Sequence, residues 1–436
     1  MRKVINKFLI SIFLLISSIS VYAQSSGAYG DYSPYSLFGM GDLYKEGSAY
    51  NKSMGGVGIA TRNKRYINYL NPAAVTARDT LSFMADFGLI QNNKIYRQND
   101  LISANNIFNI SSLMLSVPIY KSSALMVGLT PFSNLGYDFS FREEDENIIG
   151  NTGNIYHIHN GAGSVYQTFI GAGVTLFKDL SLGAEFIYYF GNLNKTYNVN
   201  YTNNSIRSIN SGTEQIIRGV TGKFGLQYEK KLSSSLSITL GATYRLKTNM
   251  LGETTNYEYA NQSNITDTVS FNTFSNKNVK IADELGVGIA LSNKDKWSAE
   301  VNYLRSDWGD TNIDKTEGFS NDKYSKFSAT ASESLKAGFE IVPNRNDIRY
   351  YFLRCTYRAG VYYNKEYYKF DGNNVNSMGL TLGFTLPIYK WYNGFTMGVD
   401  IGRRGSLVNN MVLENYFNFS IGFNIHDIWF QKPKYD

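Results

Sequence analysis

The stretch Leu380-Thr381-Leu382-Gly383-Phe384-Thr385-Leu386 alternates apolar side chains with threonine and glycine, and Phe417 to Ile425 repeats the alternation. Side chains of a β-strand point to opposite faces with a period of two. Each stretch therefore has one apolar face and one polar face. Fourteen such stretches follow one another, with approximate spans 81–97, 106–118, 123–141, 164–177, 180–200, 214–230, 235–256, 266–291, 297–308, 328–342, 348–363, 375–387, 394–404 and 411–426. The pattern predicts an all-β chain, either a membrane barrel or a soluble sandwich.

The connectors between these stretches favour the barrel. Those after even-numbered stretches are tight, for example Lys178-Asp179 and Lys231 to Ser234, and most of the others are long and polar, such as Arg142 to Gly163. Outer-membrane barrels have an even number of antiparallel strands, short periplasmic turns and longer external loops. We therefore expect a 14-stranded antiparallel transmembrane β-barrel over residues 80–436, with both chain termini on the periplasmic side.

The first 23 residues have the features of a signal peptide. Three basic residues lie within positions 1–7, an apolar run covers 8–19, and Val21-Tyr22-Ala23 fits a cleavage site. The run is shorter than the roughly 20 residues that a spanning helix needs. Residue 24 is Gln rather than Cys, so no lipid can be attached there. We expect removal of the signal near Ala23 and localisation in the outer membrane of a Gram-negative-type bacterium.

The composition excludes some classes of protein. The formal charge of +6 falls to +3 without the three basic residues of the signal, which argues against a nucleic-acid partner. Tyr and Phe are abundant, at 34 and 27 residues, and suit strands and membrane interfaces. The single cysteine, Cys355, cannot form an internal disulfide.

Residues 24–79 differ from the rest of the chain. They are rich in Gly, Ser, Tyr and Asn, alternate poorly, and contain Gly55-Gly56-Val57-Gly58 and Asn71-Pro72-Ala73-Ala74. Irregular backbone at membrane depth is tolerated where protein shields it from lipid. We expect this segment to be a plug inside the barrel.

Alternation also assigns charged side chains to the inner face, because a charge that faces hydrocarbon costs several kcal/mol. The residues assigned in this way are Glu185, Lys223, Arg245, Glu300, Lys336, Glu340, Arg354, Arg358 and Asp400. Their signs are mixed, which indicates ion pairs that fill a lumen rather than an ion-selective pore. Cys355 would then face lipid or a neighbour. Trp297, Trp308, Trp391 and Trp429 fall at strand ends, where we expect an aromatic girdle.

Catalysis has little support. His157 and His159 share one face of an extended segment in the predicted loop after the third strand, but no third metal ligand is near them. Ser420 and Asp427 lie close to His426 in sequence, which alone does not make a catalytic triad. We expect no enzyme activity, no metal and no cofactor, and the role of the two loop histidines stays open.

The third strand is interrupted over Thr130 to Tyr137. Pro131 has no backbone N–H to give to a ladder, and proline within a sheet marks an edge or a bulge. A closed barrel has no edge, so we expect a kink that either opens the wall or is a harmless bulge. The residues of this expected opening are Pro131, Phe132, Asn134 and Gly136.

The chain resembles the FadL family of outer-membrane transporters of long-chain fatty acids and other hydrophobic compounds. The resemblance is carried by Gly55-Gly56-Val57-Gly58-Ile59-Ala60 and by Tyr69-Leu70-Asn71-Pro72-Ala73-Ala74. That family has fourteen strands, an Asn-Pro-Ala motif in an N-terminal hatch, and a kinked third strand that makes a lateral opening. The resemblance implies that Gly55, Gly56, Asn71, Pro72 and Ala73 belong to a hatch. The tail from Ile428 to Asp436 runs past the family's usual terminal aromatic residue.

The resemblance implies passive uptake of a hydrophobic small molecule, which leaves sideways through the strand-3 kink. The expected partners are this ligand, outer-membrane lipid and, during insertion, the barrel-assembly machinery; we expect a monomer. One alternative is a non-transporting barrel that serves as a binding platform for secreted or surface proteins. A lipid-modifying enzyme and a soluble exported β-protein are further alternatives, and recovery without detergent would identify the last.

Overall fold

The computed structural model describes residues 31–78, 82–120, 122–203, 205–262, 265–294, 296–320, 326–388 and 393–428. The expected signal peptide, Trp391 and Trp429 lie outside these ranges. Within them, no helix combines the length and the apolar character that crossing a membrane requires.

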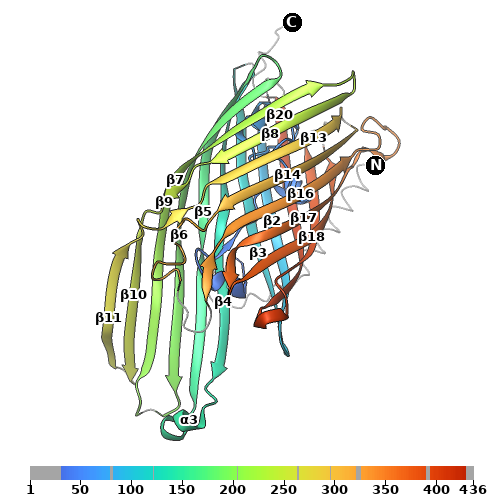
Figure 1. Ribbon diagram of the computed structural model, residues 1–436. Coiled ribbons are helices and arrows are strands. Elements are labelled where there is room, and N and C mark those ends of the chain that lie inside the picture. Colours follow the sequence, from blue (N-terminus) through green and yellow to red (C-terminus); the bar gives the residue numbers. More distant parts are fainter. Residues whose placement is uncertain are drawn as a thin grey trace.

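Fourteen antiparallel strands form a closed barrel, as the sequence predicted (Figure 1). Each pairs with its neighbours along the chain, and the last pairs with the first to close the wall. The strands are β2 (Ser82–Gln98), β3 (Leu101–Tyr120), β4 (Ser123–Arg142), β5 (Ile155–Leu176), β6 (Leu180–Tyr201), β7 (Ser208–Lys231), β8 (Leu236–Arg245), β13 (Glu284–Asn293), β14 (Trp297–Asp307), β16 (Ala331–Ile341), β17 (Thr356–Phe370), β18 (Asn373–Pro387), β19 (Gly394–Arg404) and β20 (Leu413–Ile428).

The alternation that predicted the strands also describes the wall. Leu380 and Leu382 are 45% and 49% exposed on the outside, whereas Thr381 between them is buried on the inside. Strands of 10 residues, such as β8 and β13, match the 9–11 residues that a tilted strand needs to cross a bilayer. The apolar outer face can therefore contact lipid over the full thickness of the bilayer.

The two ends of the barrel differ. At the near end, β2 begins and β20 ends; at the far end, β5, β6 and β7 continue well past the other strands (Figure 1). There they join β10 (Glu253–Gln262) and β11 (Ile265–Ser275), while α3 (Glu146–Thr152) caps the turn between β4 and β5. We call the far-end part of β4 to β7, with β10 and β11, the raised sheet.

Three predicted spans need correction. The spans 235–256 and 266–291 are each broken, because β9 (Thr248–Asn249) and β12 (Lys280–Ile281) leave the wall and pair with each other. This inward bend buries Met250, Val279 and Ile281, which alternation alone cannot reveal. The span 348–363 begins with the 3-10 helix η3 (Tyr351–Arg354), so β17 starts only at Thr356.

The shift at β17 changes two side-chain assignments. Arg354 lies in η3, where its guanidinium stacks on Tyr351 at 4.9 Å, and does not project into the lumen from a strand. Cys355, expected to face lipid or a neighbour, is buried, with its Sγ 3.7 Å from the Tyr351 carbonyl oxygen, so it faces a neighbour and not lipid. Two connector lengths also differ from the expected pattern. The connector 343–347 follows the tenth stretch and was therefore expected to be tight, but it is longer, because β16 ends at Ile341 and β17 begins at Thr356. Conversely, the turns Asn99-Asp100 and Asp371-Gly372 at the far end are short.

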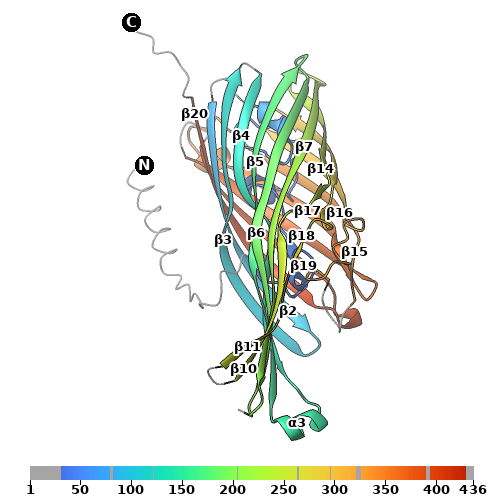
Figure 2. The same ribbon diagram turned by 90° about the vertical axis from the view of Figure 1, so that its left-hand side faces the viewer.

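The chain from residue 31 to residue 78, hereafter the N-terminal segment, lies inside the barrel (Figure 2). It contains η1 (Pro34–Leu37), β1 (Asp42–Leu43), α2 (Ala49–Lys52) and η2 (Pro72–Thr76). Its first described residue, Asp31, pairs at 2.7 Å with Lys94 in the far-end half of β2. The described part of the segment therefore starts toward the far end. The two chain termini, expected on the periplasmic side, lie outside the described residues.

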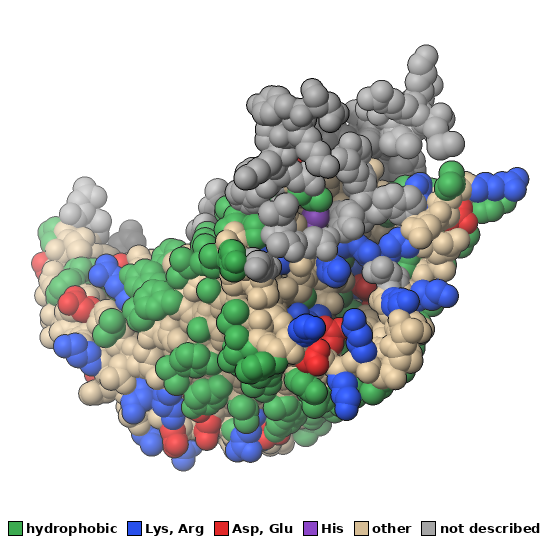
Figure 3. All heavy atoms as spheres, turned by 90° about the horizontal axis from the view of Figure 1, so that it is seen from above, with side chains coloured by type: hydrophobic (Ala, Val, Ile, Leu, Met, Phe, Trp, Pro, Cys, Tyr) green, Lys and Arg blue, Asp and Glu red, His purple; other side chains and the backbone are tan. Residues whose placement is uncertain are grey.

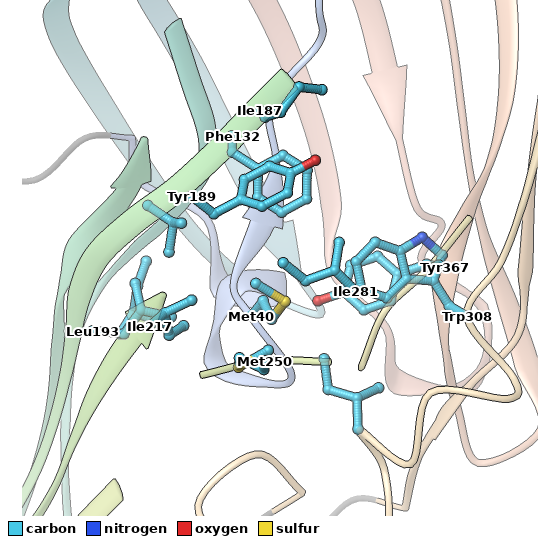
Figure 4. Close-up of a cluster of buried hydrophobic side chains, with 14 of the residues drawn as sticks. Met40, Phe132, Ile187, Tyr189, Leu193, Ile217, Met250, Ile281, Trp308 and Tyr367 are labelled. Carbon is cyan, nitrogen blue, oxygen red and sulfur yellow. The ribbon is translucent and has the colours of Figure 1, made fainter. Parts of the chain in front are cut away.

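An apolar cluster lies in the lumen, between the N-terminal segment and the wall (Figure 4). Met40 of the N-terminal segment meets Met250 and Ile281 from the inward bend, and Trp308 lies against Tyr367 with ring centroids 4.9 Å apart. Trp308 is 1% exposed, so the girdle predicted for it is wrong. Its place just past the end of β14 suggested an interface, but the chain turns inward there. The remaining short elements are β15 (Phe327–Ala329) and η4 (Val408–Asn410).

Candidate functional site

The wall is incompletely hydrogen-bonded between β3 and β4. These strands pair only from Leu113 to Tyr120 on β3, against Leu129 to Ser123 on β4. Toward the far end, β3 continues to pair with β2 and β4 with β5, but not with each other. Backbone N–H and C=O groups that are buried need partners. The edge of β4 beyond Leu129 therefore needs a substitute for β3.

Pro131 lies where the two strands part. The β4–β5 ladder shifts register between Pro131 and Ser133, which is the bulge expected of a proline in a closed wall. From Thr130 to Tyr137 every side chain is buried, so β4 turns into the barrel at this point. Phe132 packs on Tyr189 at 4.6 Å inside the lumen (Figure 4).

The N-terminal segment takes the place of β3 along this edge. In β1, Asp42 and Leu43 pair with Asn134 and Ser133. The Tyr44 N–H donates to the Phe132 carbonyl at 2.9 Å, and the Ser33 N–H donates to the Gly136 carbonyl at 2.8 Å. All four residues predicted for the opening thus lie at the break in the wall or on the edge that the N-terminal segment closes.

Gly136 allows this close approach. A Cβ at this position would lie 1.8 Å from the Asp31 carbonyl oxygen, a backbone atom that cannot move alone. Any side chain at 136 would push the start of the N-terminal segment off β4.

The Asn-Pro-Ala motif packs on glycines of β5, β6 and β7. The Asn71 side chain accepts from the Ala73 N–H at 3.0 Å and donates to the Ile59 carbonyl at 2.7 Å, which fixes two parts of the N-terminal segment to each other. Pro72 begins η2, where its missing N–H costs nothing. The glycines Gly173, Gly183 and Gly225 lie side by side on β5, β6 and β7 and leave the space that the motif fills.

Gly55 and Gly56 lie against the wall formed by β16, β17 and β18. Both have positive φ, of 72° and 76°, which glycine adopts without strain. The Gly55 N–H donates to Thr381 Oγ1 at 2.7 Å, and a Cβ at Gly55 would lie 2.7 Å from the Ala337 carbonyl oxygen. The inner-facing wall glycines were missed by our sequence reading, although they occur at alternate positions of the strands.

Apart from Arg354, the charges assigned to the inner face lie on strands and are buried or half-buried: Glu185, Lys223, Arg245, Glu300, Lys336, Glu340, Arg358 and Asp400. Arg358 and Glu340 pair across neighbouring strands at 2.7 Å. Glu300 instead accepts from the Ala60 N–H at 2.7 Å and from the Thr61 hydroxyl. Several of the wall charges therefore serve to hold the N-terminal segment.

Ion pairs also attach the N-terminal segment to several strands of the barrel. Arg404 bonds Asp42 at 2.6 Å and Glu414 at 2.6 Å, Lys45 bonds Asp400 at 3.1 Å, and Glu46 bonds Arg245 at 3.2 Å. Burial alone would raise the pKa of Asp42, but the Arg404 guanidinium holds that pKa below its usual range. Arg404 and Glu414 were not singled out from the sequence. Nor were Asp42, Lys45 and Glu46, whose partners in the wall are about 200 to 360 residues away.

An internal cavity of about 230 Å³ lies between the N-terminal segment and the barrel wall. Charged side chains border it beside apolar ones, and Lys45, Lys52, Lys336, Glu366 and Asp400 are among them. Burial, together with the neighbouring Lys45, lowers the pKa of Lys52 to about 7. The lumen thus contains an apolar cluster and, beside it, a cavity bordered by charged side chains.

His157 and His159 lie on β5 in the raised sheet and not in a loop, which corrects their placement. They stack on Phe141 and Phe139 at 4.7 and 4.8 Å, and His157 lies 3.4 Å from a carboxylate oxygen of Glu143. Within the described ranges, no three His, Cys, Asp or Glu side chains are grouped to hold a metal. Ser420 and His426 are six residues apart on β20, about 20 Å along a strand, which is too far for a nucleophile–base pair.

Seen from the near end, Lys and Arg side chains lie next to Asp and Glu side chains, with hydrophobic side chains on the wall between them (Figure 3). The rim therefore carries both signs of charge, as the lumen does.

Comparisons with known proteins agree with this architecture. A family model described as BamG matches residues 4–436. No curated protein sequence matches the chain. Among solved structures, the Pseudomonas putida toluene transporter TodX superposes with a TM-score of 0.61 at 15% identity, covering 90% of this chain and 100% of that one.

Two further solved structures share the fold. The Ralstonia pickettii toluene transporter TbuX has a TM-score of 0.59 at 15% identity, covering 87% of this chain and 98% of that one. A Pseudomonas aeruginosa FadL homologue has a TM-score of 0.53 at 11% identity, with coverages of 88% and 98%. The resemblance to the FadL family is thus confirmed at the level of the fold, and the fold is that of an outer-membrane barrel.

Proposed function

This chain belongs to the BamG family, and from that premise we propose that it is an outer-membrane barrel for passive uptake of hydrophobic compounds, with lateral exit between β3 and β4. The observation that carries the proposal is the separation of the two strands beyond Leu113 and Leu129, where, among the described residues, only the N-terminal segment closes the wall. Along this edge the N-terminal segment is joined to β4 by a few hydrogen bonds, so this part of it can move away from β4 without breaking the barrel.

The apolar cluster supports a hydrophobic ligand. Phe132, Tyr189, Leu193 and Ile217 lie together just inside the break in the wall (Figure 4). Each buried CH₂ group contributes about 0.8 kcal/mol, so a ligand that displaces the N-terminal segment from these side chains can be held without a specific polar contact. No energy source is required for movement down a concentration gradient.

The proposal also concerns the class of compound that the barrel carries. Long-chain fatty acids follow from the sequence resemblance, and toluene is the compound carried by the two transporters TbuX and TodX, which share the fold. The existing cavity of about 230 Å³ is below the roughly 300–1,000 Å³ of sites for drug-sized ligands. A compact ring compound therefore needs less movement of the N-terminal segment than a long acyl chain.

Two measurements test the proposal. Uptake of labelled toluene and of a labelled long-chain fatty acid is compared in cells with and without the protein, and compounds retained by the purified barrel are identified by mass spectrometry. We expect protein-dependent uptake of at least one of the two and retention of hydrophobic compounds. An empty barrel that carries neither compound and instead co-purifies with exported proteins would overturn transport in favour of the binding platform.

A further inference from the structure

The raised sheet has two edges, and their backbone groups are paired differently. On the β4 edge, the N-terminal segment occupies the backbone groups from Phe132 to Gly136, and the Tyr32 hydroxyl donates to the Asp138 carbonyl at 3.0 Å. On the other edge, β11 pairs with β10 alone, and none of the described residues pairs with its outer side. One edge is covered by the chain itself and the other is left open.

β11 is a long and little-protected edge strand. It has 11 residues, about 37 Å at ~3.4 Å per residue, and its side chains are exposed on both faces of the sheet. Ile265, Val269 and Phe271 are each about 60% exposed. An open edge of this kind is a template for another strand.

The usual protections against such pairing are nearly absent from β11. Natural proteins blunt an open edge with lysine, proline, inward charges or a bulge. Residues 265–275 read Ile-Thr-Asp-Thr-Val-Ser-Phe-Asn-Thr-Phe-Ser, without lysine, arginine or proline. The single charge, Asp267, is paired with Arg207, so it does not repel a neutral strand. A bulge at Val269 is the one feature that departs from a regular edge.

We propose that the open edge of β11 binds an extended, uncharged segment of a different protein, which adds a strand to the raised sheet. Main-chain hydrogen bonds would supply affinity, and Val269 and Phe271 would contact alternate side chains of the added strand. The raised sheet stands beyond the membrane-crossing band, at the end where the connectors are long, so the partner is a protein at the outer surface.

A second copy of the chain fits this edge poorly. β11 runs along the long axis of the molecule (Figure 1), and two copies in one membrane insert the same way up. Their β11 strands would then point in the same direction, whereas antiparallel pairing, the commoner kind, needs opposite directions. A different protein has no such restriction.

The test uses photo-cross-linking in the native host. A benzophenone amino acid replaces Asp267, Phe271 or Thr273 in turn, with Asn194 and Asn200 on β6 as control positions in the same sheet. We expect adducts from the three edge positions to map to one short segment of one partner protein, in steps that follow the strand register, and none from β6. No adducts, adducts scattered over unrelated proteins, or adducts to a second copy would overturn the proposal.

A charge-matched pair of variants completes the test. Val269→Lys with Phe271→Lys protects the edge, whereas Asn194→Lys with Asn200→Lys adds the same charge on exposed positions of β6. The cross-link from Thr273 should be lost in the first variant and kept in the second; loss in both would contradict an edge interaction. Uptake of hydrophobic compounds should be unchanged in the edge variant, so this inference and the transport proposal can fail independently.

Discussion

Replacing Gly136 with valine should release the start of the N-terminal segment from β4. The Cβ would stand 1.8 Å from the Asp31 carbonyl oxygen, so the segment must move. The movement breaks the Ser33 N–H bond to the Gly136 carbonyl, at 2.8 Å, and the bonds between Ser36 Oγ and the Gly136 backbone, at 3.1 and 3.2 Å. Two to three hydrogen bonds at about 1 kcal/mol each amount to roughly 2–3 kcal/mol, or about a 30- to 140-fold shift toward the released state.

The shift can be measured as the reactivity of a cysteine in the segment. Ser33 is 1% exposed and close to cysteine in size, so Ser33→Cys in a Cys355→Ser background reports release through its rate of labelling by a soluble maleimide. We expect labelling to be faster by one to two orders of magnitude with Gly136→Val. The control is Gly150→Val in α3, where a Cβ meets nothing within 4 Å and the rate should not change. An unchanged rate with Gly136→Val in a folded barrel would refute the reasoning.

Three further outcomes follow from the same contacts. Arg404→Met leaves Asp42 and Glu414 buried without their partner and should lower the free energy of unfolding by about 3–5 kcal/mol, measured by chemical denaturation, with a loss below 1 kcal/mol counting against the ion-pair cluster. Gly183→Ala places a Cβ 2.3 Å from the Pro72 carbonyl carbon and should cost about 1–3 kcal/mol in the same assay. Because burial holds the pKa of Lys52 near 7 and an exposed lysine titrates near 10.4, the melting temperature should rise between about pH 7 and 10, and Lys52→Met should remove that rise.

The period-two pattern was sufficient to predict the barrel because each strand faces lipid on one side and the lumen on the other. The same rule assigned Glu185, Lys223 and Arg358 to the inner face. The rule that apolar residues face lipid fails wherever a strand leaves the wall, as at β9 and β12. There the chain bends inward, and its apolar residues are buried in the lumen. Met250 and Trp308 are apolar because they fill the lumen and not because they face lipid.

The candidate site was predictable only in part. Pro131 marks the break in the wall because proline cannot join a regular ladder, and this effect is local. The closing of the break by Ser33, Asp42 and Tyr44 depends on contacts across about 90 to 100 residues of chain. The glycine at 136 carries no sign of its role until Asp31 is placed beside it.

The measurement that tests lateral exit most directly is uptake by a barrel whose break is locked. Leu43 and Ser133 are opposed in the β1–β4 ladder, so Leu43→Cys with Ser133→Cys in a Cys355→Ser background can form a disulfide that ties the N-terminal segment to β4. Ala359→Cys with Leu382→Cys, opposed in the intact β17–β18 wall, is the control. We predict that oxidation stops uptake of the hydrophobic compound in the first variant, that reduction restores it, and that the control is unaffected. Uptake at the unmodified rate through the oxidised β1–β4 lock would contradict exit between β3 and β4.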